Sequence, residues 1–209
     1  MEVRKITERA HIKLFNQWSF EDVEVRDWTL ERYINLKPII IPHSCGRHNK
    51  KTFWKTKKVN IIERFINRLL APGFMDSKIK GHKSSYQSGK KNRILKAMKD
   101  AFRLINLKTG KNPIQILIDA ICNTAPREET TKIAMGGISY ASAVDIAPQR
   151  RVDLAIKYLV QAIGARTHTN IKSFGENIAQ ELMMAAQNSQ DSRAVKKKDE
   201  VERIAVSAR

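Results

Sequence analysis

The stretch Lys132–Ile163 constrains the fold of this 209-residue chain more than any other part. It predicts two short β-strands joined by Gly136–Gly137, a break at Pro148, and a long helix opening with Arg150. Two glycines supply the positive φ angles of a tight hairpin turn, and proline suits the first turn of a helix. Because the rest of the chain reads as helical, the hairpin is predicted to project as an arm.

The predicted hairpin is too small to be stable alone, because a two-stranded hairpin is marginal in water. Its second strand carries few large apolar side chains, namely Ile138, Tyr140, Val144 and Ile146. We therefore expect the hairpin to pack against a partner.

Apolar residues recurring every three or four positions predict six helices. Their ranges are 60–70, 91–107, 113–123, 150–163, a helix starting at Ser173, and 193–209. Ser173 and Glu176 form a capping-box pattern at the fifth start. On the first helix, Glu63, Arg64, Asn67 and Arg68 are expected to face away from the core. The predicted fold class is mainly α, a bundle of about six helices with a protruding β-hairpin and a basic extended N-terminal region.

We predict two parts in the chain. Residues 1–58 are an N-terminal extension with a basic RNA-binding arm, and residues 59–209 are a helical domain with the hairpin near 130–146. The aromatic residues before position 37 are expected mainly to cover the body of the protein, and stacking on bases is the alternative. Residues 37–58 contain no acidic residue and interleave cations with aromatics, which suits nucleic acid better than a solvated basic segment.

The charge balance points to a polyanionic partner. The chain has 39 Lys and Arg against 21 Asp and Glu, for a formal net charge of +18. Nucleic acid is the stronger candidate and an anionic membrane surface the weaker one. No long apolar run or signal-peptide core is present, so we expect a soluble intracellular protein without a membrane partner. Two cysteines provide no disulfide framework.

The sequence contains no complete catalytic or metal-binding pattern. His43, Cys45 and His48 have the spacing of half a zinc site, but the second ligand pair is missing, and Cys122 lies on an apolar helix. Gly89–Lys90 lacks the remaining residues of a phosphate-binding loop. We predict no metal, no cofactor and no enzyme activity.

The positive charge lies mostly in loops and tails, which favours an irregular RNA surface over the regular groove of DNA. Three alternatives stay open at this point. They are a basic DNA-packaging or regulatory protein, an RNA-modifying enzyme, and a translational repressor that binds messenger RNA.

Several segments resemble one family. They read WSFEDVEVRDWTLERYINLKP, IIPHSCGRHNKKTF, KVNIIERFINRLL, KTGKNPIQILIDAICNTAPREETTKI, GGISYASAVDIAPQRRVDLAIKYL and AVKKKDEVERIAVSAR. The family is the universal small-subunit ribosomal protein seven in its archaeal and eukaryotic form, called protein five in eukaryotes. The GGISY to VDIAPQRRVDLA stretch and the KKKDEVERIA tail are its most specific motifs.

The resemblance implies a helical bundle with a hairpin in the head of the small ribosomal subunit, in the cytoplasm. It implies binding to the head domain of small-subunit rRNA, nucleation of head assembly, and a hairpin beside the exit-site tRNA and the mRNA path. Ribosomal protein eleven is the implied protein neighbour, and no homo-oligomer is expected.

Candidate RNA-binding residues come from the resemblance and from the basic tracts. The resemblance implies Arg47, Lys50, Lys51, Lys55, Lys57, Lys58, Lys90, Lys91, Lys132, Arg150, Arg151, Lys196, Lys197 and Lys198. The basic tract after Asp76 adds Lys78 and Lys80, and the exposed side of the long helix adds Lys157. The residues expected near tRNA and mRNA are Met135, Gly136, Gly137, Ile138 and Tyr140.

Two expectations make the RNA hypothesis testable. Changing Arg150 and Arg151 to Glu is expected to abolish RNA binding and leave the fold intact. The hypothesis fails if the cations prove to be paired with the protein's own carboxylates.

Overall fold

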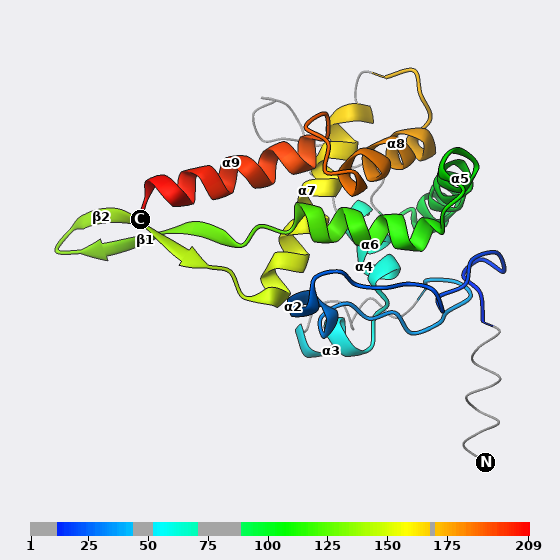
Figure 1. Cartoon of the computed structure of the whole chain (residues 1–209), viewed down its shortest axis with the longest axis horizontal. Coiled ribbons are helices and arrows are strands. Elements are labelled where there is room, and N and C mark those ends of the chain that lie inside the picture. The colour runs from blue at the N-terminus through cyan, green and yellow to red at the C-terminus, as the bar shows by residue number, and fades with distance from the viewer. Residues whose placement is uncertain (1–11, 44–51, 71–88, 168–169) are drawn as a thin grey trace, which may run out of the picture.

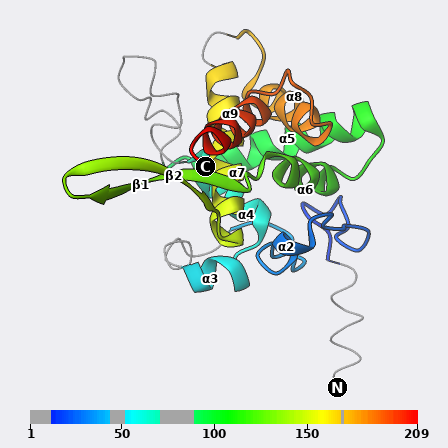
Figure 2. The same ribbon diagram turned by 60° about the vertical axis from the view of Figure 1, so that its left-hand side comes forward.

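The computed structural model describes residues 12–43, 52–70, 89–167 and 170–209. These ranges contain eight helices and one antiparallel hairpin, which confirms the predicted fold class (Figure 1). Helix α7 runs through the middle of the molecule. Helices α8 and α9 lie on one side of it, and the N-terminal segment with α2 and α3 lies on the other (Figures 1 and 2).

The helices are α2 (Trp28–Glu31), α3 (Thr52–Lys57), α4 (Ile61–Leu69), α5 (Lys91–Thr109), α6 (Pro113–Thr124), α7 (Pro148–Thr167), α8 (Phe174–Ala186) and α9 (Arg193–Ser207). The strands are β1 (Glu128–Met135) and β2 (Ile138–Asp145). All six predicted helices are present, and the short helices α2 and α3 are additional. Periodicity does not detect such short helices, because four to six residues complete barely one turn.

Capping side chains define the helix ends as expected. Asn112 accepts a hydrogen bond from the backbone of Ile114 at the start of α6, and Pro113 is the first helical residue. Ser173 and Glu176 bond each other's backbone N–H groups, so the capping box of α8 is confirmed.

Helix α7 is buried over most of its circumference because α4, α6, α8 and α9 all contact it. Its predicted inward residues are buried, as are three further hydrophobic side chains. The buried set is Val152, Ala155, Ile156, Tyr158, Leu159, Val160, Ala162 and Ile163. A helix enclosed on so many sides fixes the positions of its neighbours, so α7 sets the geometry of the bundle.

The described part of the N-terminal extension packs into the same core. Its buried residues are Leu14, Trp18, Phe20, Leu30 and Ile34. The Trp18 ring meets Phe102 of α5 edge to face, with centroids 5.5 Å apart. The interpretation that these aromatics cover the body is therefore confirmed for them, whereas Trp28 is 81% exposed. The division of the chain at residue 58 stays a prediction.

Helix α4 departs from the expectation that its polar side faces water. Glu63 and Arg64 are each only 3% exposed. Glu63 forms an ion pair with Lys91 of α5, and Arg64 forms one with Asp153 of α7. The prediction for these two residues is wrong, because α4 lies between two other helices that bring counter-charges to its polar side.

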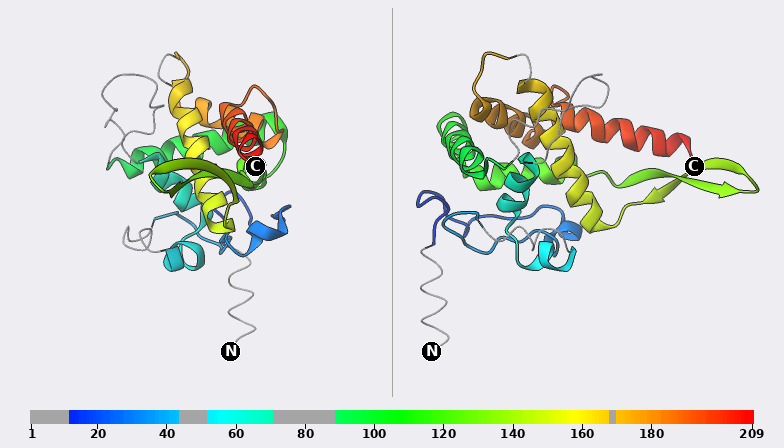
Figure 3. Two further views of the ribbon diagram at one scale, coloured as in Figure 1. Left: turned by 90° about the vertical axis from the view of Figure 1, so that its left-hand side faces the viewer. Right: turned by 180° about the vertical axis from the view of Figure 1, so that it is seen from behind.

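The hairpin follows the predicted geometry and finds part of its support inside the chain. Gly136 and Gly137 have φ angles of 58° and 83°, as a tight two-residue turn requires. The Ala143 N–H donates to the Ala208 carbonyl at the end of α9, and Arg209 pairs with Glu128. The distal half extends beyond the end of α9 (Figure 3).

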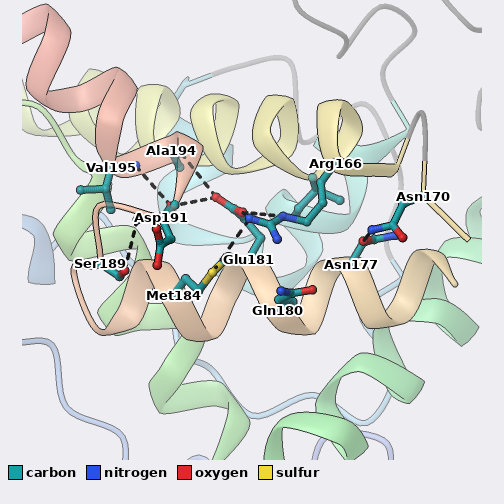
Figure 4. Close-up of polar contacts among 12 residues, drawn as sticks. Arg166, Asn170, Asn177, Gln180, Glu181, Met184, Ser189, Asp191, Ala194 and Val195 are labelled. Atoms are coloured by element: carbon teal, nitrogen blue, oxygen red, sulfur yellow. Dashed lines mark hydrogen bonds and ion pairs between the residues drawn. The ribbon is translucent and has the colours of Figure 1, made fainter. Parts of the chain in front are cut away.

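A buried carboxylate joins the three C-terminal helices. Glu181 of α8 has a fully buried side chain that pairs with Arg166 in the last turn of α7, with an N–O distance of 3.1 Å. Its other oxygen accepts hydrogen bonds from the Ser192 hydroxyl and the Ala194 N–H at the start of α9 (Figure 4). Both oxygens of this carboxylate are thus bonded to a neighbouring helix.

Among the described residues, no helix combines the length and the apolar composition needed to cross a bilayer.

We predict that Glu181→Gln lowers the free energy of unfolding by about 3 kcal/mol, because it removes the buried carboxylate that pairs with the half-buried Arg166. Urea denaturation followed by circular dichroism measures the change. Substituting the exposed Glu21 with Gln is the matched control and should shift stability by less than about 0.5 kcal/mol. Equal stability of the two variants would contradict the structural role of Glu181.

Candidate nucleic-acid interface

The first two turns of α7 contact four other elements through three charged side chains. Arg150 binds Glu129 of β1 through its Nε and NH2 groups, at 2.6 and 3.0 Å. Arg151 reaches the N-terminal segment, and Asp153 reaches α3 and α4. These two turns therefore position the surfaces on which the candidate cations lie.

Arg151 is a buried structural residue. It is 7% exposed and donates to the Thr29 hydroxyl at 2.7 Å, to the Asp27 carboxylate at 2.9 Å and to the Pro126 carbonyl at 3.2 Å. These bonds tie the start of α2, the entrance to the hairpin and α7 together. The expectation that Arg151→Glu leaves the fold intact is therefore wrong, because a carboxylate would be buried beside Asp27.

Asp153 collects two cations from the N-terminal half of the chain. Lys55 Nζ lies 2.6 Å and Arg64 NH2 lies 2.9 Å from the same carboxylate oxygen. Burial raises the pKa of Asp153, but the Lys55 hydrogen bond and the Arg64 charge outweigh it, so its pKa lies below the ordinary value of 3.8. The carboxylate therefore stays ionised at neutral pH and holds α3 and α4 against α7.

A groove lies beside this cluster, between α4 and the first half of α7. We call it the α4–α7 groove; its volume is about 740 Å³. Its lining residues are Lys55, Arg64, Asn67, Arg68, Ala147, Gln149, Arg150, Asp153, Leu154, Ile156 and Lys157. Five of these are cationic and one is acidic, so the groove favours an anionic ligand.

A second, smaller hollow of about 300 Å³ lies between α7 and α9. We call it the α7–α9 groove. Its charged lining residues are Arg193, Lys196, Lys197 and Glu200, beside the largely buried ring of Tyr158. Lys196 is exposed, and Lys197 pairs with Glu200 at 2.9 Å one turn away. Exposed pairs of this kind are weak and are easily exchanged for a phosphate contact.

The structure separates the predicted cations into three groups. Lys57, Lys58, Lys90, Lys132 and Lys196 are exposed, and Lys157 is half-buried beside the α4–α7 groove. Among the twelve that lie in the described ranges, at least six pair with carboxylates, namely Lys55, Lys91, Arg150, Arg151, Lys197 and Lys198. Arg47, Lys50, Lys51, Lys78 and Lys80 lie outside the described residues.

The hairpin residues divide in the same way. Gly136, Gly137 and Tyr140 are exposed, with Tyr140 at 56%. The backbone of Met135 and Ile138 forms the last strand pair before the turn. The two turn glycines and the Tyr140 side chain are thus accessible to a ligand.

Local sequence patterns missed several groove residues. The periodicity of α4 predicts a solvent-facing side that includes Arg64, Asn67 and Arg68. The sequence does not indicate Gln149 and Asp153 as ligand-binding residues. Their partners are 89 positions away in the case of Arg64 and Asp153, so no short-range pattern announces them. The feature of the sequence that indicates the start of α7 as a candidate site is the family motif VDIAPQRRVDLA.

Among the described residues, no group of three His, Cys, Asp or Glu side chains is placed to hold a metal ion. Cys45 and His48 of the weighed partial zinc site fall in the undescribed range 44–51.

Comparison with known proteins decides the family. The model of the family described as ribosomal protein S7p/S5e matches residues 30–209. The chain belongs to this ribosomal protein family. A curated relative, the small ribosomal subunit protein uS7 of Methanothermobacter thermautotrophicus, is 44% identical over 195 residues, which is 93% of this chain and 98% of the relative. The resemblance seen in the motifs is thereby confirmed, and S7p/S5e is a family of ribosomal proteins rather than of enzymes.

We predict that Arg151→Gln and Arg150→Gln differ sharply in stability. Removing the buried Arg151 strands Asp27, at a cost of about 3 kcal/mol. Removing Arg150, whose side chain is 59% exposed, costs less than about 1 kcal/mol. Urea denaturation of both variants measures the difference, and similar losses would contradict the assigned roles.

A pH dependence follows from Asp153. Because its folded-state pKa lies below its unfolded value, the carboxylate stabilises the fold above about pH 4. That contribution is lost as the pH falls through the folded pKa. The stability difference between wild type and Asp153→Asn should therefore shrink between pH 7 and pH 3 in urea titrations. The exposed Asp22→Asn is the control, and a difference for Asp153→Asn that is constant with pH would refute the assignment.

Proposed function

We propose that this chain is a structural component of the small ribosomal subunit that binds small-subunit rRNA in the head. The family membership and the relative named a small ribosomal subunit protein support this proposal. The observation that carries it is the pair of grooves along α7, because both are lined by Lys and Arg side chains.

The grooves suit folded RNA better than a regular duplex. The α4–α7 groove is built by α3 and α4 together with α7, which lies far from both in the sequence, and the α7–α9 groove lies over a different part of α7. Phosphates of a folded RNA follow irregular paths that two separate hollows and flanking loops match. The undescribed cations Arg47, Lys50, Lys51, Lys78 and Lys80 belong to segments next to α3 and α5, and we assign them to the same RNA.

A role in head assembly rests on preorganisation. The ion pairs of Asp153 with Lys55 and Arg64 hold α3, α4 and α7, which line the α4–α7 groove, in fixed positions before any RNA binds. A rigid protein surface pays less ordering entropy on association and orders the RNA strands that contact it. We therefore propose that the bound chain nucleates folding of the head rRNA.

We assign the hairpin to the neighbourhood of the exit-site tRNA and the mRNA path. It projects from the body, which lets its tip reach ligands that the grooves do not contact (Figure 1). The hairpin carries the exposed apolar side chains Ile133, Tyr140 and Val144, and α9, which contacts both strands, carries the exposed Ile204 and Val206 near its C-terminal end. These apolar residues support contact with a neighbouring ribosomal protein, for which ribosomal protein eleven is the candidate that the resemblance implies.

The proposal predicts a preference for structured rRNA over duplex DNA. In filter binding at moderate salt, a head-domain rRNA fragment should bind at least about tenfold more tightly than a DNA duplex of equal length. Equal affinities would favour the alternative of a DNA-binding regulatory protein. As a second readout, the chain should co-sediment with small subunits after a high-salt wash.

Cations of the α4–α7 groove should contribute to the salt dependence. For Arg68→Gln with Lys157→Gln, we expect the slope of log K against log salt to fall by about 0.7 to 1 per lost phosphate contact. The control is Lys108→Gln with Lys111→Gln, which removes two exposed charges beyond the grooves. An identical slope for both double variants would remove this groove from the interface.

A further inference from the structure

The polar atoms that lack a hydrogen-bond partner concentrate in one place. The described residues contain three buried side-chain atoms of this kind, namely Arg64 Nε, Asn67 Nδ2 and Gln149 Oε1. All three belong to residues that line the α4–α7 groove. Leaving such an atom unpaired costs about 1 to 3 kcal/mol, so three on one groove indicate that a ligand completes them.

Arg64 is the most constrained of the three. Its side chain is 1% exposed, and its two terminal nitrogens already bind Asp153 and the Tyr33 carbonyl. Those bonds hold the guanidinium in place and leave Nε as its one nitrogen without a hydrogen-bond partner. A side chain locked by its other contacts cannot turn toward solvent to satisfy this donor.

Gln149 is also oriented by its neighbours. Its Nε2 donates to Asp153 Oδ2 at 3.5 Å, a long contact that nevertheless assigns the nitrogen to that side. The oxygen is then the free atom and requires a donor. The unpaired atoms beside the groove are therefore two donors, Arg64 Nε and Asn67 Nδ2, and one acceptor, Gln149 Oε1. The Arg64 side chain is buried and held in place, whereas Asn67 and Gln149 are only half-buried and can turn their carboxamides into the groove.

This pattern distinguishes among ligands. A phosphate offers acceptors only, so it leaves the Gln149 oxygen unpaired. The edge of a nucleobase carries donors and acceptors together, and Asn and Gln carboxamides are the side chains that pair with such edges. The volume of about 740 Å³ lies within the range of roughly 300 to 1,000 Å³ for small-molecule sites.

We propose that the α4–α7 groove holds one unpaired base of the bound RNA. The carboxamides of Asn67 and Gln149 pair with its edge, and Arg68 and Lys157 at the rim take the flanking phosphates. Bases in RNA loops and bulges are unstacked and available for such capture. The inference rests on the proposed rRNA binding and adds to it a site that reads a base.

The test compares neutral amides with charges. In filter binding to the head-domain rRNA fragment, Asn67→Ala with Gln149→Ala should lower affinity about tenfold without changing the slope of log K against log salt. The slope stays constant because no cation is lost. The control Gln17→Ala with Asn106→Ala removes two exposed amides and should bind like wild type.

Chemical probing of Watson–Crick edges supplies the second readout. Wild type should protect one unpaired base that the Asn67→Ala, Gln149→Ala variant leaves reactive, while other protections persist. Unchanged thermal unfolding of the free variant checks its fold. If wild type binds the fragment and the variant matches it in affinity and protections, the groove holds only water and this inference is overturned. If wild type itself does not bind, the proposed function fails instead.

Discussion

Ion pairs in the first two turns of α7 hold the molecule together. Two arginines at a helix N-terminus are unfavourable by themselves, because the helix dipole is positive there. The structure compensates by supplying Asp27 from the N-terminal segment and Glu129 from the hairpin, while Asp153 binds Lys55 and Arg64 in turn. Two turns of helix thereby fix the N-terminal segment, α3, α4 and the base of the arm. Glu181 joins the opposite end of α7 to α8 and α9 in the same manner.

Local patterns predicted what local physics controls. The helix stripes, the capping box at Ser173 and the Gly136–Gly137 turn are all present, because each depends on residues within a few positions. The burial of Arg151 and of the polar side of α4 was missed. Arg151 meets Asp27 across 124 positions, so its surroundings are created by tertiary packing alone. The candidate site shares this limit. The family resemblance and the exposed side of the long helix gave Lys55, Arg150 and Lys157, whereas Arg64, Arg68 and the amides of Asn67 and Gln149 were not predicted.

The distribution of charge separates scaffold from surface. Pairing with the protein's own carboxylates counts against RNA binding, and at least half of the predicted cations in the described ranges do pair. The buried pairs serve the fold, whereas exposed ones such as Lys197–Glu200 are weak enough to exchange. The formal net charge of +18 ensures that many cations have no acidic counterpart in this chain. The same residue types thus perform two tasks that only burial distinguishes.

The way in which α9 meets the hairpin has a mechanical consequence. In the described part of the chain, the polar contacts of α9 with the hairpin region are made at Arg127, Glu128 and Ala143, all near its base. From the strand pair of Thr130 and Ala143 to Met135 there are five residues, or roughly 17 Å at the usual rise per residue. The arm therefore behaves as a cantilever clamped at one end. Any small tilt of α9 is magnified at the free end, which makes the helix a natural lever for the position of the tip.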